Sequence, residues 1–506
     1  MPETFTCTSI SGNEISWVDE IIGSGSMKDV YFAPDRSYVV QMLKTRPDQN
    51  GIDRLRSLIF EKRNTIFLAA GGDYWRRLFV WPDDMIDHNG RVGLIAPTYP
   101  KAFYFEDGQA PGSALQVKGQ VKHGKWFASG WIRSCLDPRE LGTWRSHIQM
   151  LVQLAQAVRR MHMAGWAHSD LSYKTVLVDP RSGSACVIDV DGLVVPGQFP
   201  PEVEGTPDFI APEVIATRHL RLDDPLRKLP NRSTDQHALA VLIYLYLLYR
   251  HPLRGGKEHD TTDPERDESL SMGEGALFVE HPTDRSNRIR LEDQREENRK
   301  WSDTDKVPYT VLGPYLAPLV ERAFITGLHA PAERPTAGEW EDALIRTSDL
   351  LVPCANAQCE QKWFVLRSTP GQHCPFCGTQ VPGQLPIMIP SRGRETGDGV
   401  RWIPENQRLV VFDNQELRPW HVSTGAWPNE RLAEADRTRV GYFQSHEGAW
   451  VLVNEGMPRL HDLTAGRDVP VGGQVTLTEG HQLRLDILEN GGRVMQVQLA
   501  HPGSPA

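Results

Sequence analysis

The chain of 506 residues lacks long hydrophobic runs and strongly basic stretches. Its most apolar segment, residues 238–249, is far shorter than the roughly 20 apolar residues that a helix needs to cross a bilayer. The formal net charge is −10, whereas nucleic acids and anionic membranes are bound through basic surfaces. We therefore expect no membrane span and no direct contact with nucleic acid.

We also expect neither a secretory leader nor a disulfide framework. The first 17 residues show no basic region, apolar run or small-residue cleavage site. Of the seven cysteines, Cys7, Cys135 and Cys186 are scattered along the chain, and this spacing is not that of a disulfide-stabilised secreted domain. These absences predict a cytoplasmic protein.

Two kinds of hydrophobic pattern divide the first 350 residues. Residues 15–45 and 91–97 read as strands, while residues 53–70 carry apolar side chains at helical spacing. From residue 145 onward long helical patterns prevail, and residues 254–275 are polar. The length exceeds one ordinary core, so we expect an α+β fold with a small sheet-rich lobe and a larger helical lobe, followed by further domains.

Short motifs in this region carry the chemistry of phosphate transfer. A glycine-rich loop, "GSGSMKDVY", occupies residues 23–31. Downstream follow "HSDLSYKTVLVD" (168–179), "VIDVDG" (187–192), "GTPDFIAPE" (205–213) and "ERPTAGEW" (333–340). In this order and spacing the chain resembles the protein-kinase superfamily over about residues 10–345. The resemblance implies a bilobal protein-kinase-like domain over residues 1–347, with an N-lobe at about 10–97 and a C-lobe at about 98–347.

More narrowly, the chain is similar to bacterial kinases that carry a C-terminal zinc ribbon, including those of TerY-P phosphorylation triads. The features shared with them are the Asp-x-Asp of residues 189–191 and the stretches "HALAVLI" and "RPTAGEW". This resemblance implies a Ser/Thr protein kinase that uses ATP and Mg²⁺. It also implies two partners, a von Willebrand A-type protein and a PP2C-type phosphatase, in a stress or defence response.

The kinase resemblance assigns roles to individual residues. Asp170 matches the aspartate that accepts or orients the proton of the attacking hydroxyl, and Asp189 matches the aspartate that binds Mg²⁺. Asp191 stands at the usual glycine position, where it is either a second ligand or a turn residue. Glu61 is the candidate for the helix glutamate that steadies the phosphate-binding lysine, the alternative being a solvated helix residue. Glu213 is expected to pair with Arg334.

Further positions are predicted to contact the nucleotide. The loop contributes to phosphate binding, and residues 96–100 would be the hinge whose backbone receives adenine. These positions are Gly23, Ser24, Gly25, Ser26, Val30, Gln41, Pro97, Thr98 and Tyr99.

The lysine that normally contacts the phosphates is missing from its strand. In "YVVQMLK", Gln41 takes its position and Lys44 follows three residues later. The loop, however, carries Lys28 where a third glycine is expected. This resembles the with-no-lysine kinases, in which a loop lysine replaces the strand lysine, and a lysine is a point charge on a flexible stem that can act from a neighbouring strand. The alternative is that Lys28 is an ordinary solvated lysine.

The catalytic loop also departs from the kinase pattern. Thr175 stands where kinases keep the asparagine that binds a second metal, and a threonine hydroxyl is a possible Mg²⁺ ligand. Ser169 replaces an arginine that commonly anchors a phosphorylated loop. Lys174 is the candidate for the loop cation that kinases carry at the position of Ser172. These departures keep open a pseudokinase scaffold, whereas "GTPDFIAPE" disfavours a small-molecule phosphotransferase.

Four cysteines cluster after residue 350 in two pairs. Cys354-x4-Cys359 and Cys374-x2-Cys377 have the spacing of a closed tetrahedral Zn²⁺ site. We therefore expect a structural zinc ribbon over residues 350–385. A redox role for the second pair is disfavoured because a matching first pair is present.

The remaining residues show strand patterns. We expect a linker at residues 386–400 and an all-β sandwich at 401–503, built from short segments bounded by Gly, Asn, Asp or Pro. Its rhythm of strands and turns resembles a forkhead-associated domain. The residues that would hold phosphothreonine are not recognisable around 437–446, so we expect a contact domain.

Overall fold

The computed structural model describes residues 3–25, 27–68, 71–195, 205–367, 372–396, 399–432, 435–485 and 492–500. The chain forms two compact units. The first comprises residues 1–142, 146–309 and 318–341, and the second comprises residues 143–145, 310–317 and 342–506.

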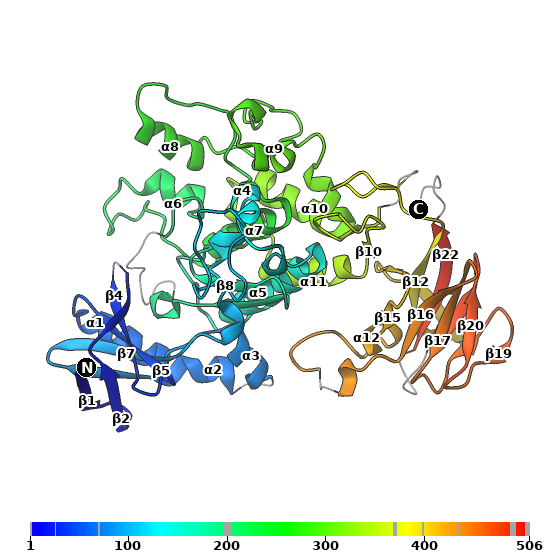
Figure 1. Ribbon diagram of the computed structural model, residues 1–506, viewed down its shortest axis with the longest axis horizontal. Helices are drawn as coiled ribbons and strands as arrows, with labels where there is room; N and C mark the ends of the chain where they lie inside the picture. Colours follow the sequence, from blue (N-terminus) through cyan, green and yellow to red (C-terminus); the bar gives the residue numbers. More distant parts are fainter. Residues whose placement is uncertain are drawn as a thin grey trace. The chain divides into compact units, whose positions relative to one another are not determined.

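The first unit begins with antiparallel β structure (Figure 1). A hairpin of β1 (Thr4–Thr8) and β2 (Glu14–Val18) precedes a five-stranded sheet of order β3-β4-β5-β7-β6. The strands of that sheet are β3 (Ile21–Ser24), β4 (Lys28–Phe32), β5 (Tyr38–Leu43), β6 (Asp84–His88) and β7 (Arg91–Pro97). Alternate residues face an apolar cluster that includes Trp17, Val40 and Ile95, as the period of a strand requires.

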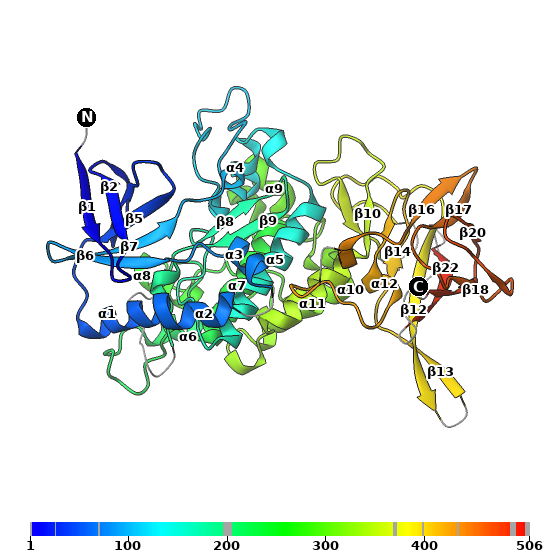
Figure 2. The same ribbon diagram turned by 90° about the horizontal axis from the view of Figure 1, so that it is seen from below.

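A helical stretch lies along this sheet (Figure 2). It consists of α1 (Gln49–Arg56), a π-helical turn (Ser57–Lys62) and α2 (Arg63–Phe67), and α3 (Gly72–Leu78) follows. The Asp48 side chain accepts a hydrogen bond from the Gly51 backbone N–H at 2.8 Å and so caps α1. The helix predicted over 53–70 therefore begins earlier, at its capping residue.

The helical part of this unit is organised around two long helices, α5 (Trp144–Met163) and α7 (Arg232–Leu248). Asn231 caps α7 in a capping box with Thr234. Every residue from Ala238 to Leu248 is buried, so the most apolar run of the sequence is a core helix. No helix among the described residues is long and apolar enough to span a membrane.

Shorter elements complete this part. A hairpin of β8 (Val176–Asp179) and β9 (Ser184–Val187) carries the residues that lead into the Asp-x-Asp motif. The shorter helices are α4 (Gly130–Ser134), α6 (Pro212–Thr217), α8 (Pro264–Met272) and α9 (Glu296–Ser302). Helices α10 (Gly313–Glu321) and α11 (Ala337–Ser348) each contain residues assigned to both units. The small sheet and the larger set of helices have the element order that the sequence predicted.

The second unit contains a small hairpin and two larger antiparallel sheets. The hairpin pairs β10 (Leu351–Pro353) with β11 (Trp363–Val365). The larger sheets share one apolar core, to which Met388, Phe443 and Met495 contribute. One sheet contains β12 (Leu385–Thr396), β13 (Gly399–Pro404), β14 (Leu409–Val410), β18 (His461–Asp462), β19 (Arg467–Asp468), β21 (Gln482–Leu485) and β22 (Arg493–Ala500); the other contains β15 (Glu416–Leu417), β16 (Gly441–His446), β17 (Ala449–Asn454) and β20 (Gln474–Leu477).

The prediction of a linker at residues 386–400 is wrong. Strand β12 covers most of this segment and pairs with β22 from Leu385 to Arg392. Its polar end, which resembles a linker in composition, pairs with β13 instead (Figure 2). The antiparallel β structure after this segment is confirmed, while the forkhead-associated resemblance stays a prediction.

Candidate functional site

The catalytic-loop motif is fixed by a buried aspartate at the start of α7. One carboxylate oxygen of Asp235 accepts a hydrogen bond from the His168 backbone N–H at 2.7 Å, and the other accepts one from the Ser169 N–H at 3.2 Å. Ser169 has a φ of 66°, a left-handed conformation that costs free energy for a residue with a Cβ. The two bonds to Asp235 hold the loop in this shape.

Asp170 follows this turn and contacts the start of the "GTPDFIAPE" segment. Its Oδ1 accepts a hydrogen bond from the Thr206 hydroxyl at 2.7 Å. The two residues line a cavity of about 10 Å³ together with Phe209 and Ile210, which is room for about one water molecule. The structure thus brings the predicted catalytic aspartate together with the "GTPDFIAPE" segment.

Thr175 lies behind Asp170 and its hydroxyl is used by the loop itself. Thr175 Oγ1 donates to the Asp170 carbonyl at 2.8 Å and accepts from the Ser172 backbone N–H at 3.0 Å. The residue is 4% exposed. A hydroxyl oxygen has two acceptor lone pairs, so one of them remains for a metal ion.

The ion pair between Glu213 and Arg334 is confirmed. Two guanidinium nitrogens of Arg334 donate to the two carboxylate oxygens of Glu213, at 2.8 and 2.7 Å. Arg334 also donates to backbone carbonyls of Gly327, Leu328 and Ser233. This two-point geometry fixes the end of the motif that begins at Gly205.

Lys28 extends from β4 into a cluster of polar side chains. Its Nζ lies 2.7 Å from Asp191 Oδ1, 3.0 Å from Asp189 Oδ1 and 3.1 Å from Gln41 Oε1. We call Lys28, Gln41, Asp189 and Asp191 the lysine cluster. The structure therefore brings the loop lysine, the strand glutamine and both acidic residues of the Asp-x-Asp motif together.

The charges of the lysine cluster support one another. Burial alone would lower the pKa of Lys28, but the Asp191 and Asp189 carboxylates hold it above its usual range. Burial would likewise raise the pKa of Asp191, but Lys28 and Arg54 hold it below its ordinary value. Lys28 and Asp191 are therefore both charged at neutral pH.

The second lysine of this region, Lys44, supports the glycine-rich loop from outside. Its Nζ donates to the Gly25 carbonyl at 2.7 Å and to Ser24 Oγ at 2.9 Å, and its side chain is 39% exposed. The Gly25 N–H donates to the Lys28 carbonyl at 2.9 Å and closes the turn. Gly23 lies on β3 in the same sheet, and Ser26 lies outside the described residues.

Glu61 is not placed at the lysine. Its side chain is exposed and accepts a hydrogen bond from Ser57 Oγ at 3.0 Å. Among the described residues no ion pair joins Glu61 to Lys28, because the helix turns this position toward solvent.

The helical residue that does reach the motif is Arg54, which the sequence analysis missed. Arg54 is 7% exposed, and its Nη1 donates to the Asp191 carbonyl at 2.6 Å and to the Leu193 carbonyl at 3.3 Å. Arg54 lies one helical turn before the fully buried Leu58, and residues four apart share a helix face. A charged residue on the apolar face of this helix was the available signal.

Two of the residues predicted to contact the nucleotide, Val30 and Tyr99, pack against one apolar cluster. Val30 and Tyr99 pack against buried side chains of the sheet and of the β8–β9 hairpin, including Ala96, Leu177 and Ile188. Burial raises the pKa of Tyr99 well above its usual range. Pro97 and Thr98, at the end of β7, are partly exposed.

Lys174 lines a different cavity from Asp170. That cavity has a volume of about 480 Å³ and is lined by residues of the catalytic loop, the end of α7 and the segments 125–132 and 289–302. Asp170 is not among its lining residues. The role of Lys174 beside the catalytic aspartate stays a prediction.

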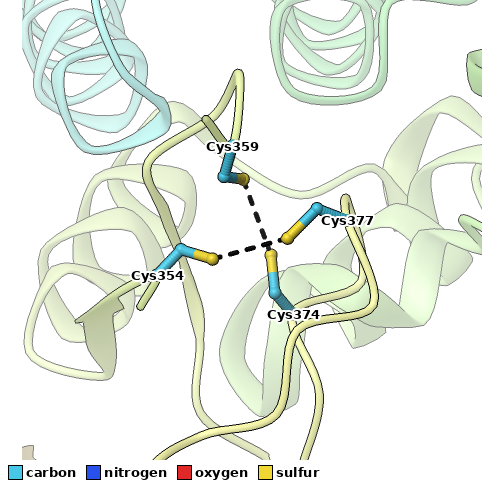
Figure 3. A group of neighbouring side chains, drawn as sticks. All are labelled: Cys354, Cys359, Cys374 and Cys377. Atoms are coloured by element: carbon cyan, nitrogen blue, oxygen red, sulfur yellow. Dashed lines mark hydrogen bonds between the residues drawn. The ribbon is translucent and has the colours of Figure 1, made fainter. Parts of the chain in front are cut away.

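The four clustered cysteines converge as the spacing predicted (Figure 3). All four Sγ atoms lie within 4.8 Å of one another, with 3.5 Å between Cys354 and Cys377 and 3.8 Å between Cys359 and Cys374. Four sulfurs around Zn²⁺ at about 2.3 Å stand roughly 3.8 Å apart in a tetrahedron. The donor set therefore fits a closed structural zinc site.

Comparisons with known proteins agree with this geometry. The model of the lipopolysaccharide kinase (Kdo/WaaP) family matches residues 137–192. Two Caenorhabditis elegans proteins are similar: death-associated protein kinase dapk-1, 28% identical over 144 residues, and serine/threonine-protein kinase dkf-1, 30% identical over 127 residues. These matches cover 28% and 24% of this chain, and they span only 9% and 16% of the two relatives.

A solved structure adds a weaker likeness. The kinase domain of a rhoptry antigen from Toxoplasma gondii aligns over 55% of this chain and 84% of its own, with a TM-score of 0.34 and 15% identity. Together, the sequence matches and the arrangement around Asp170 and Asp189 define a protein-kinase-like domain.

Proposed function

We propose that the chain is a Ser/Thr protein kinase that transfers the γ-phosphate of ATP to a protein hydroxyl. The observation that carries the proposal is the position of Lys28, whose Nζ lies 3.0 Å from Asp189 and 3.1 Å from Gln41. Phosphoryl transfer needs positive charge beside the phosphates and a metal-binding carboxylate close by. Lys28 and Asp189 supply this pair even though the strand carries glutamine.

The residues divide the work as follows. Asp170 accepts the proton of the attacking hydroxyl, and the bond from Thr206 to its Oδ1 fixes the orientation of the carboxylate. Asp189, with a side chain 42% exposed, and the free lone pair of Thr175 are the candidate Mg²⁺ ligands. When bound, Mg²⁺ neutralises charge on the phosphates. Lys174 remains the candidate for the loop cation, and it also lines the neighbouring cavity.

A protein acceptor is favoured by the segment that follows Thr206. Residues 205–213 are held at one end by Asp170 and at the other by Arg334. The lipopolysaccharide-kinase match ends at residue 192, before this segment begins. It therefore covers motifs shared by kinases of both acceptor classes.

We also propose a structural zinc site at the four clustered cysteines and membership of a TerY-P-type phosphorylation triad. Cys354, Cys359, Cys374 and Cys377 would hold one structural Zn²⁺, since all four ligand positions are filled by protein. The Asp-x-Asp motif and the "RPTAGEW" stretch support membership of a TerY-P-type triad. Its partners would be a von Willebrand A-type protein and a PP2C-type phosphatase, and co-purification with them tests this assignment.

Transfer of labelled phosphate from ATP to itself or to a generic acceptor protein tests the kinase. Lys28→Ala should lower kcat by about 10²-fold or more, since a preorganised charge at the reacting phosphate is lost. Lys44→Ala is the matched control and should stay within a few fold. Because Gln41 Oε1 lies 3.1 Å from Lys28 Nζ, Gln41→Lys in the Lys28→Ala background should restore part of the activity.

Two outcomes would contradict the proposal. Activity that survives Lys28→Ala but disappears in Lys44→Ala would mean that Lys44 contacts the phosphates. No transfer by the wild-type chain, with thermal stabilisation by ATP intact, would identify a pseudokinase scaffold.

A further inference from the structure

The lysine cluster contains an anion that the kinase resemblance does not assign to Lys28. Asp191 is the nearer of the two carboxylates, at 2.7 Å against 3.0 Å for Asp189. It is also the more buried, with a side chain 18% exposed against 42%. Charges with less access to water interact more strongly, so Asp191 contributes more to holding Lys28 than Asp189 does.

The backbone of Asp191 is held in turn by the helix beside the sheet. Arg54 on α1 donates to the carbonyls of Asp191 and Leu193 and is 7% exposed. Glu61, further along the same helical stretch, is exposed and bonded to Ser57. Among the described residues, this helical stretch therefore contributes a cation to the site and no anion to Lys28.

We propose that Asp191 is the positioning residue that holds Lys28 at the phosphates, and that Arg54 fixes the turn that carries Asp191. The pair expected between a strand lysine and a helix glutamate is thus replaced by a loop lysine and a motif aspartate. The helix acts through the backbone of the motif. Asp189 lies farther from Lys28, at 3.0 Å, and its side chain is more exposed, so it is the carboxylate available to a metal ion. This proposal rests on the proposed kinase function.

A double-mutant cycle tests it. Asp191→Asn should lower kcat at least about 10-fold, because Lys28 loses the nearer and more buried of its two carboxylate partners. Glu61→Gln should stay within about twofold, because Glu61 is exposed and does not contact Lys28. If Asp191 acts through Lys28, the Lys28→Ala, Asp191→Asn double variant should be no slower than Lys28→Ala alone. Asp191→Glu should recover part of the rate.

The cycle also separates a positioning role from a structural one. Multiplicative loss in the double variant, or a large loss in Glu61→Gln, would overturn the proposal. The same four variants can be compared by their affinity for ADP, measured by calorimetry. This measurement does not require phosphate transfer. If the chain binds ADP and the two substitutions affect its affinity independently, only this inference is contradicted. If the wild-type chain does not bind ADP at all, the proposed kinase function is contradicted as well.

An independent observation concerns the 480 Å³ cavity beside the catalytic loop. Tyr173 and Lys174, which follow Asp170 in the loop, form part of its wall, and Lys125 lies at another part. The volume lies in the range of ordinary ligand pockets. The cavity is therefore large enough to take a side chain of the protein that receives phosphate.

The charged groups of the cavity wall are unevenly paired. Arg250 pairs with Glu280 at 2.6 Å, and Arg254 Nε donates to Asp208 Oδ1 at 2.9 Å. Burial lowers the pKa of His251 to about 4, so this ring is neutral. Lys125 and Lys174 are exposed, and the described residues provide no carboxylate partner for either. We infer that this cavity binds an acidic side chain of the substrate protein, an inference that rests on the proposed kinase function.

Fluorescence anisotropy with two labelled peptides tests this specificity. One peptide carries a serine flanked by glutamates, and the other carries the same serine flanked by lysines. The wild-type chain should bind the acidic peptide at least about 10-fold more tightly, and the Lys125→Glu, Lys174→Glu double variant should lose that preference. Lys118→Glu, an exposed lysine outside the cavity, is the control.

Equal binding of both peptides by the wild-type chain, or an equal effect of Lys118→Glu, would overturn the inference. Because this readout needs no phosphate transfer, its failure is distinct from failure of the kinase function.

Discussion

The four cysteines and the lysine cluster differ in how far apart their members lie along the chain. The cysteines come from two short turns within residues 354–377, whereas Lys28 and Asp191 are separated by 163 positions. The spacing of the cysteines alone predicted that they converge, because two short turns with two cysteines each can place four sulfurs in a tetrahedron. The second group depends on which helix face packs against which loop.

The largest expected effect comes from removing one of the four clustered cysteines. Cys374→Ser should remove bound zinc and expose the segment around β10 and β11 to unfolding, since structural zinc contributes on the order of 10 kcal/mol of binding free energy in small domains. Metal content by mass spectrometry and urea denaturation measure this loss. Cys135→Ser, a cysteine outside the cluster, should keep its zinc. Retention of zinc by Cys374→Ser would mean that the four thiols are not its ligands.

A smaller effect is expected from breaking a long-range pair. Glu213 and Arg334 lie 121 positions apart, and the Arg334 side chain is 1% exposed. Arg334→Ala should lower the free energy of unfolding by about 3–5 kcal/mol, because Glu213 is left unpaired. Arg299→Ala removes an exposed pair with Glu296 and should cost at most about 1 kcal/mol. Equal losses in denaturant titrations would show that Arg334 does not hold this segment.

The smallest expected effect is a loss of folding stability at acidic pH. His147 is buried and bonded to the Tyr246 carbonyl, 99 positions away. Burial lowers its pKa to about 3. Below pH 6.5 the unfolded chain binds a proton that the folded chain does not, so stability falls toward acid. Between pH 7 and pH 5, protonation of His147 in the unfolded chain should lower the free energy of unfolding by about 2 kcal/mol. His147→Gln should show a correspondingly flatter pH dependence, and an unchanged slope would contradict this.

The sequence predicted the elements of the fold better than the contacts of the site. The kinase-like order of strands and helices, the convergence of the cysteines and the Glu213–Arg334 pair follow from periodicity, spacing and resemblance. Glu61 and Arg54 show that periodicity, spacing and resemblance do not reveal which charged side chain of a helix is buried. Both are charged residues on one helical stretch, and only packing decides that Arg54 is buried against Asp191 while Glu61 faces solvent.

The linker error has a similar cause. Residues 391–399 are polar and rich in glycine, which predicts a flexible segment. The strand character of β12 comes from pairing with the distant strand β22 and with β13, which follows it directly in the sequence. These backbone hydrogen bonds do not depend on apolar side chains, so the polar composition did not reveal them.

The 3.1 Å separation between Gln41 Oε1 and Lys28 Nζ also limits which side chain position 41 can carry. A lysine there would place two ammonium groups almost in contact, and like charges at this distance repel strongly. The neutral amide of Gln41 avoids this repulsion and instead accepts a hydrogen bond from Lys28.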